Sequence, residues 1–128
     1  MIVPIYKVVR DVGGQWRSYI ISTSTPEIGL GYELGKRIAP APGCGPLVCG
    51  VDEEEMREFF SQAVDAARGA DIYWDALVLA KGRGQISLQE WVWTTFRRAH
   101  IDELGSWPDI ILCSWVELEQ VLDIQELH

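Results

Sequence analysis

Apolar and polar positions alternate along the first part of the chain, as they do in β-strands. Residues 5–10 and 16–21 are rich in β-branched and aromatic side chains, and residues 11–15 between them contain two adjacent glycines. Because glycine adopts the positive φ angles of a tight connection, we predict a β-hairpin with a loop of about four residues. Residues 22–26 break the alternation and predict a loop.

Residues 32–51 predict two further strands joined by a rigid turn. Alternate residues of 32–38 share one face, which predicts a third strand at an edge of a sheet. Residues 40–46 contain three prolines and two glycines, a composition that stiffens and bends the backbone. The apolar run 47–51 then predicts a short buried strand.

The clearest helix signal begins at Asp52. This residue is suited to cap a helix, Glu55 stands three positions later as in a capping box, and Gly69 is suited to close the helix. Apolar side chains recur at helical spacing at Met56, Phe59, Phe60, Ala63, Val64 and Ala67. We therefore predict a helix whose apolar stripe packs on the sheet.

Residues 71–80 predict a strand that is apolar on both faces and therefore central or covered on both sides. The glycines of Lys81–Gly84 predict its end. Asp75 interrupts this strand on the face shared by Tyr73 and Leu77. Since a buried carboxylate must be paired or must change its pKa, we expect a structural ion pair at Asp75, with a functional group as the alternative.

The last third of the chain predicts a second helix and one or two strands. Ser87 and Glu90 form a second capping-box signature, and the apolar spacing that follows predicts a helix over 88–100. Residues 109–116 predict a strand. Residues 118–127 fit either a last strand or a helix.

These elements predict one α+β domain over residues 1–128. Its expected architecture is an antiparallel or mixed sheet of five to seven strands with two helices packed on it. The length of 128 residues suits one domain, and 48% hydrophobic with 23% charged residues is ordinary for a soluble globular protein.

Charge and cysteine content narrow the expected partners and location. A net charge of −8 with only 11 Lys and Arg disfavours nucleic acids and anionic membranes as partners. No apolar run approaches the ~20 residues that cross a bilayer, and the N-terminus has no signal-peptide pattern. Three cysteines, an odd number, favour reduced thiols. We therefore expect a cytoplasmic protein.

Cysteine and histidine supply the residues that a zinc site or a nucleophile pair would need. Cys44, Cys49 and Cys113 with His100 could ligate zinc, and a cysteine could pair with His100 as a nucleophile. Only one loose cysteine pair is present, however, and no local motif supports a nucleophile. We expect buried free thiols, and we predict no catalytic residue, no metal and no cofactor.

Two glycine-rich segments are candidates for binding phosphate or another anion. Neither residues 29–31 nor Lys81–Gly84 has the spacing of a dinucleotide or Walker loop. The two cations of Lys81–Gly84 could hold a small anion, and a solvated turn is the alternative.

Six tryptophans are the unusual feature of the composition. Their large rings either fill a small core or form an aromatic contact surface. The second interpretation makes Trp16, Trp93 and Trp107 candidate binding residues, and Tyr32 and Cys44 beside the proline-rich turn complete the set. The function we predict is a non-enzymatic interaction or binding protein that forms a homodimer or binds a protein partner.

Three segments and the helix after them resemble a sparse pattern in an uncharacterised family of small bacterial and phage proteins. The segments are 6–10 (YKVVR), 32–35 (YELG) and 40–51 (PAPGCGPLVCGV), so the resemblance covers roughly residues 1–80. The chain departs from that pattern at Cys49–Val51, where larger apolar or aromatic residues are common. The resemblance implies a prokaryotic or phage origin, and it carries no activity or site.

The order of Tyr32, glycine-rich turn, apolar strand and helix is also similar to the nicotinamide-cofactor pocket of ADP-ribosyltransferase-like folds. This similarity implies an alternative function, an enzyme or binder of a nucleotide-like ligand. The chain lacks the His or Arg opening strand and the clear catalytic Glu of such folds. A fold-level analogy is a weak basis for function, so the non-enzymatic interpretation stays first.

Overall fold

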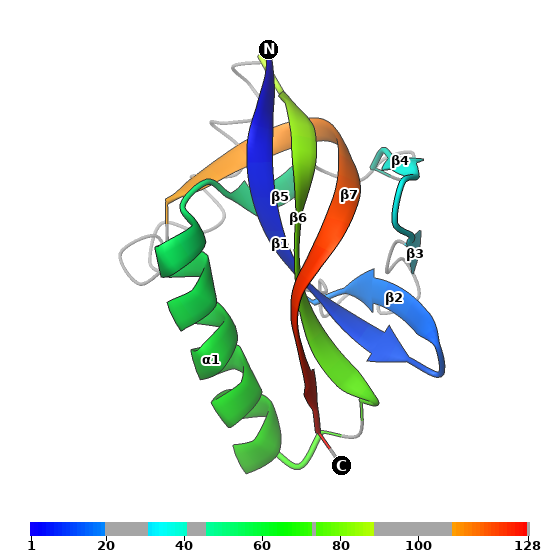
Figure 1. Cartoon of the computed structure of the whole chain (residues 1–128), viewed down its shortest axis with the longest axis vertical. Coiled ribbons are helices and arrows are strands. Elements are labelled where there is room, and N and C mark those ends of the chain that lie inside the picture. The colour runs from blue at the N-terminus through cyan, green and yellow to red at the C-terminus, as the bar shows by residue number, and fades with distance from the viewer. Residues whose placement is uncertain (20–30, 41–45, 73, 89–108, 128) are drawn as a thin grey trace.

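A computed structural model describes residues 1–19, 31–40, 46–72, 74–88 and 109–127 (Figure 1). The elements in these ranges are β1 (Ile2–Val12), β2 (Gln15–Ser18), β3 (Gly31–Tyr32), β4 (Arg37–Ile38), β5 (Leu47–Gly50), α1 (Glu53–Gly69), β6 (Ala76–Ile86) and β7 (Ile110–Glu126). Every strand pair among them is antiparallel. The prediction of an α+β sheet of five to seven strands is confirmed for this part of the chain.

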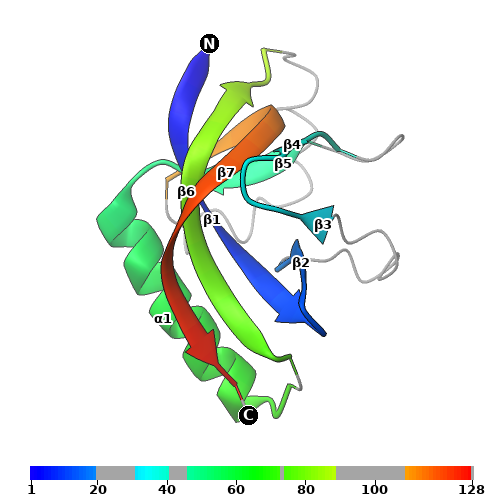
Figure 2. The same cartoon turned by 45° about the vertical axis from the view of Figure 1, so that its right-hand side comes forward.

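The sheet curls into a small, incomplete barrel. β6 is its centre, paired with β1 on one side and with β7 on the other. β5 pairs with β7 at four positions and meets β1 at a single pair, Tyr6 opposite Gly50. The path β1–β6–β7–β5 therefore returns to β1, while β2 and β3 extend the sheet from β1, and β4 extends it from β7 (Figures 1 and 2).

β7 follows the curve because it carries three β-bulges against β6. The register shifts leave Ser114, Glu119 and Leu122 as extra residues on β7. Each bulge bends the strand and increases its right-handed twist. In Figure 2, β7 accordingly sweeps across β6 rather than running straight beside it.

Side-chain alternation along the strands creates two apolar layers. The barrel interior contains Ile5, Val9, Tyr32, Leu47, Cys49, Val78, Ala80, Cys113, Val116 and Leu118. The layer between sheet and helix contains Val8, Met56, Phe60, Ala63, Val64, Ala67, Leu77 and Leu79. β6 contributes to both layers, so the prediction of a strand covered on both faces is confirmed. Helix α1 lies along one side of β1, β6 and β7 (Figure 1).

α1 begins after Asp52 as predicted, but Glu55 and Gly69 do not have the capping roles that the sequence predicts. Asp52 accepts the N–H of Glu55 at 2.9 Å, as an N-cap does. The Glu55 carboxylate, however, accepts the N–H of Asp109 at 2.9 Å, which ties the helix to the residue before β7. Gly69 is the last helical residue, and the positive φ follows at Asp71, with φ 56°.

The predicted single strand over 32–38 is wrong, because a turn divides it. Tyr32 ends β3, Gly35 adopts φ 75°, and β4 covers only Arg37–Ile38. The Gly35 N–H donates to the carbonyl of Leu118 at 2.8 Å, so this turn is fastened to β7. The hairpin of β1 with β2 and the short buried strand β5 are confirmed.

The predicted strand end at Lys81–Gly84 is also wrong. β6 begins later than predicted and continues through these residues to Ile86. A side chain at Gly82 would collide with the Glu117 carbonyl and would stand 2.8 Å from the Cα of Leu118. The glycine therefore permits the close approach of β7 and does not make a turn.

Asp75 is exposed and precedes β6, so the predicted buried ion pair is wrong. Its Oδ2 accepts the N–H of Gly13 at 2.8 Å, and its own N–H donates to the carbonyl of Asp11 at 3.0 Å. Asp75 thus secures the turn between β1 and β2.

The tail whose structure the sequence left open is a strand, because β7 runs without interruption to Glu126. Except for exposed Leu88, the helix expected over 88–100 lies outside the described residues, so a second helix stays a prediction. Of the turn over 40–46, only Pro40 and Pro46 are described. Within the described ranges, no helix is long and apolar enough to span a bilayer.

Candidate functional site

The structure describes two of the five predicted binding residues, Trp16 and Tyr32. They face each other across β2 and β3, and Trp16 packs half-buried against the interior layer that contains Tyr32. Tyr32 is only 5% exposed. Both rings therefore belong to the core of the sheet. Cys44, Trp93 and Trp107 lie outside the described residues, and their binding role stays a prediction.

A groove of about 470 Å³ lies on the outer face of β1, β6 and β7. Its lining consists of residues 2–6, 81–83, 119 and 120. Because Ile5 faces the interior, its neighbours Pro4 and Tyr6 face outward, and Lys81 lies opposite Tyr6 on β6. The bulge at Glu119 falls directly beside the groove, and bulges often re-aim side chains next to binding sites.

The two cations of this groove differ in their partners. Arg83 donates from Nη2 and Nε to one carboxylate oxygen of Glu117, at 3.0 and 3.2 Å. Half-buried Lys81 has no hydrogen-bond or ion-pair partner among the residues that the structure describes. Lys81 is therefore the cation that an incoming anion would meet. The solvated-turn alternative for this segment is wrong, since it is strand, whereas the anion site stays a prediction.

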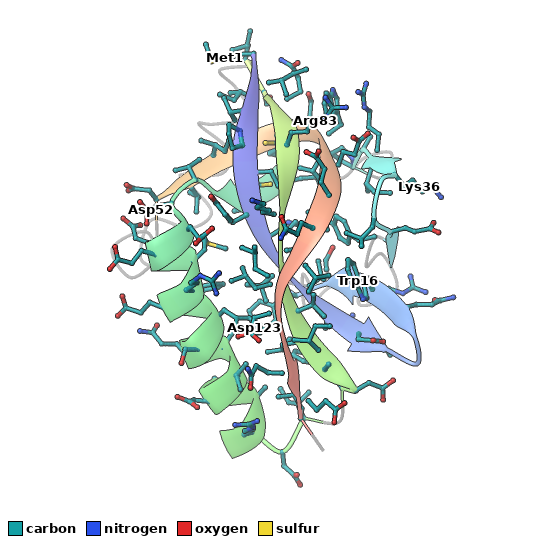
Figure 3. The ribbon with its side chains drawn as sticks, in the orientation of Figure 1. Met1, Trp16, Lys36, Asp52, Arg83 and Asp123 are labelled. Carbon is teal, nitrogen blue, oxygen red and sulfur yellow. The ribbon has the colours of Figure 1, made fainter. Side chains whose placement is uncertain are left out.

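A row of charged and aromatic side chains continues from the groove across β7. Glu117 lies between Arg83 on β6 and Arg37 on β4. The Arg37 guanidinium stacks on the ring of Trp115, 3.8 Å from its centre. We call Arg37, Lys81, Arg83 and Trp115 the cationic face; Figure 3 shows Arg83 near one end of the molecule, with Lys36 to its side beside β4.

A different set of polar groups lies inside the barrel around Lys7, an inward position between Ile5 and Val9. The Lys7 Nζ donates to the carbonyl of Val48 at 2.8 Å. It also lies 5.5 Å from the centre of the Tyr32 ring. Since β1 and β5 pair at only one position, this ammonium joins the two strands where their backbone ladder is missing.

Cys49 on β5 and Cys113 on β7 complete this interior cluster. Cys49 lies opposite Ile111 and Cys113 lies opposite Leu47, so the two cysteines are diagonal neighbours on adjacent strands. They are 1% and 0% exposed, and each thiol alters the pKa of the other. We call Lys7, Tyr32, Cys49 and Cys113 the interior cluster.

The two thiols ionise very differently because they interact with each other. The polar interaction with Cys113 lowers the pKa of Cys49, against the effect of burial, and the charge of Lys7 lowers it further. The same interaction with Cys49, together with burial, raises the pKa of Cys113. Cys49 is therefore the first of the pair to become a thiolate.

Burial would lower the pKa of Lys7, but Tyr32 and the two cysteines outweigh it. The electrostatic interactions with Tyr32, with Cys49 and with Cys113 leave the pKa above its ordinary value. The interior cluster thus holds a positive charge next to two sulfur atoms. The sequence contains a signal for this cluster. Alternate residues of a strand share a face, and Lys7 lies between Ile5 and Val9 on a face that is otherwise apolar.

A metal site would need more ligands than the described part of the interior supplies. No three His, Cys, Asp or Glu side chains gather there or elsewhere in the described ranges. Cys44 and His100, the other zinc ligands considered, lie outside those ranges.

Comparison of the chain with protein-family models, with curated proteins and with solved structures finds no match in any of the three. The resemblance to small bacterial and phage proteins therefore stays an expectation.

Proposed function

We propose that the chain is a small, non-enzymatic cytoplasmic protein that binds an acidic segment of a protein partner in the groove of β1, β6 and β7. The observation that supports this proposal is the half-buried ammonium of Lys81, which has no partner among the described residues. A carboxylate placed there would form a charge-assisted hydrogen bond, which is stronger than a neutral one.

The cationic face favours a protein partner over a small ligand, because it extends beyond the groove. Arg37 and Trp115 do not line the groove but flank it across β7. Arginine and tryptophan are enriched at the energetic centres of protein interfaces. The chain as a whole carries −8, so an acidic partner is repelled at long range and must be held by close contacts.

The lining of the groove supports binding rather than catalysis. Its side chains that titrate are Tyr6, Lys81, Arg83 and Glu119, and it contains no Ser, Cys or His. The lining therefore lacks the Ser–His and Cys–His pairs that are common in covalent catalysis.

Selection from a random peptide library would test the proposal. We expect the selected peptides to be rich in Asp and Glu, and Lys81→Gln to weaken their binding about tenfold, equivalent to about 1.4 kcal/mol. Lys36→Gln, which removes an exposed cation in the turn between β3 and β4, is the matched control. Peptides without acidic enrichment, or equal affinities for both variants, would refute the proposal.

Light scattering addresses the expected homodimer. If the acidic partner is a second copy, Lys81→Gln should weaken self-association while Lys36→Gln should not. A strict monomer would reject the homodimer, and a partner that stays fully bound after Trp115→Ala would remove the aromatic residue from the cationic face.

The alternative is a binder or enzyme of nucleotide-like ligands with an ADP-ribosyltransferase-like fold. It depends on Tyr32 as part of a pocket, and Tyr32 is buried beside Trp16. A thermal-shift screen with NAD and nucleotides separates the two functions. A ligand at 100 times its dissociation constant stabilises a protein by ~2.7 kcal/mol, so the absence of any shift rejects this alternative.

A further inference from the structure

We propose that Cys49 and Cys113 are a redox site, in which a small disulfide such as oxidised glutathione converts the two thiols into an intramolecular disulfide between β5 and β7. This inference is independent of the groove, because the two cysteines lie in the barrel interior and the groove lies on the outer face.

The register of β5 and β7 makes the two cysteines diagonal neighbours on the same face of adjacent strands. Diagonal neighbours on antiparallel strands have Cα atoms about 7–8 Å apart. A disulfide joins Cα atoms at up to about 6.8 Å, so oxidation requires the strands to approach by roughly 1 Å.

Lys7 makes one of the two thiols reactive. Its ammonium donates to the carbonyl of Val48, the neighbour of Cys49 on β5, and its charge acts on both thiols. A neighbouring cation stabilises a thiolate, which is the nucleophile in disulfide exchange. Cys49 is therefore the attacking residue and Cys113 the resolving residue.

Access to the buried thiols comes from the seam between β1 and β5. β5 pairs with β7 at all four of its residues, but it is held to β1 only by the pair Tyr6–Gly50 and by the bond from Lys7 to Val48. A seam with so few hydrogen bonds opens locally at low free-energy cost. Opening of this seam, with β5 still paired to β7, exposes Cys49, so the rate of oxidation depends on this opening.

The exchange proceeds in two balanced steps. The Cys49 thiolate attacks one sulfur of oxidised glutathione, and the other glutathione leaves as a thiolate and takes up a proton. The Cys113 thiol then gives its proton to solvent and attacks the sulfur of Cys49, which releases the second glutathione. Two protein thiols are oxidised, and one glutathione disulfide is reduced to two thiols.

The test uses the full chain with Cys44→Ser, so that only one intramolecular disulfide can form. The protein is incubated near neutral pH with graded ratios of oxidised to reduced glutathione, quenched with acid and analysed by mass spectrometry. We expect a species lighter by two hydrogens, with Cys49 and Cys113 joined, native tryptophan fluorescence and reversal by dithiothreitol. A folded protein that stays reduced under oxidised glutathione alone would overturn the proposal.

Single-thiol variants test the order of attack in the same background. With Cys113→Ser, Cys49 should accumulate as the glutathione adduct; with Cys49→Ser, Cys113 should react about tenfold more slowly. Equal rates in the two variants would mean that both thiols are inert until the core opens as a whole.

Lys7 variants distinguish activation of Cys49 from simple exposure. Lys7→Met should reduce the ratio of the Cys49 rate to the Cys113 rate and should shift the pH dependence of the Cys49 rate upward. Lys7→Arg should restore both quantities, and Lys36→Met should leave them unchanged. If Lys7→Met only loosened β5, both thiols would react faster at an unchanged ratio, and the assigned role of Lys7 would be wrong.

Discussion

The carboxylate of Glu55 accepts the backbone N–H of Asp109, although 54 positions separate the two residues. The carbonyl of Asp109 in turn accepts the N–H of Val51 at 3.4 Å. The backbone at the start of β7 is thereby held on both sides by the residues that lead into α1. A local capping residue thus has a long-range role.

Glu55→Ala should lower the free energy of unfolding by about 1 kcal/mol, because it removes the acceptor for Asp109. Glu55→Gln retains an acceptor oxygen and should lose less. Glu54→Ala, one residue earlier on the exposed side of the helix, should change stability by no more than about 0.5 kcal/mol. Urea unfolding followed by tryptophan fluorescence measures all three. Equal effects of the alanine variants at positions 54 and 55 would contradict this assignment.

Two glycine substitutions should change stability in opposite directions. Gly82→Ala places a methyl group against the backbone of Glu117 and Leu118, which cannot move without breaking the β6–β7 ladder. We expect a loss of about 3 kcal/mol. Gly69→Ala meets nothing within 4 Å and removes glycine from the last turn of a helix, so we expect a gain of up to about 1 kcal/mol.

The same urea experiment decides the glycine comparison. If Gly82→Ala were tolerated with a loss below about 0.5 kcal/mol, an ordinary surface effect, the close contact of β6 with β7 would be wrong.

Lys7→Met should destabilise the protein by about 1–3 kcal/mol near neutral pH, since the buried carbonyl of Val48 loses its donor. Lys36→Met is the control, because Lys36 is exposed in a turn. Hydrogen exchange should show faster opening of β5 in Lys7→Met, and an unchanged β5 would contradict the joining role of Lys7.

Stability should fall at alkaline pH because of Cys113 and Lys7. Both have raised pKa values in the folded state, so above pH 9.0 for the thiol and 10.5 for the ammonium the folded protein retains protons that the unfolded chain has lost. Their contributions are complete below these values and disappear as the pH rises through the folded pKa. Cys49 has a lowered pKa, so its contribution is complete above 9.0 and is lost at lower pH.

We therefore expect the free energy of unfolding to rise slightly toward pH 9.0 and to fall steeply beyond it. Urea unfolding across this range checks the curve, and Cys113→Ala with Lys7→Met should flatten its alkaline part. A stability that keeps rising above the ordinary lysine pKa of 10.5 would contradict the charge assignment.

The parts of the fold that sequence predicts well are those with local causes. Asp52 caps α1 with a residue three positions away, and the glycines between β1 and β2 form a tight hairpin, so spacing alone locates both. The path of β7 depends instead on pairing with distant residues. Gly82 resembled a turn residue, yet its cause is the approach of Glu117, a contact that local sequence does not contain.

The candidate site likewise has one part that the sequence predicts and one part that it does not. The cations of the groove, Lys81 and Arg83, are two positions apart in the sequence, so the sequence alone predicts an anion site there. The interior cluster unites residues from β1, β3, β5 and β7, and only the register of the closed sheet places Cys49 beside Cys113. Side-chain alternation could have located Lys7 on the inner face, but it could not have identified the sulfur atoms that Lys7 meets.

The central position of β6 has a consequence for the protein during its synthesis. Residues 76–80 are entirely apolar, and one edge of this segment is covered only once β7 has paired beside it. Until residues 110–126 leave the ribosome, the nascent chain therefore carries an uncovered strand edge of the kind that promotes aggregation. A chaperone that shields residues 76–80 during translation should raise the soluble yield more than any stabilising substitution made in the finished fold.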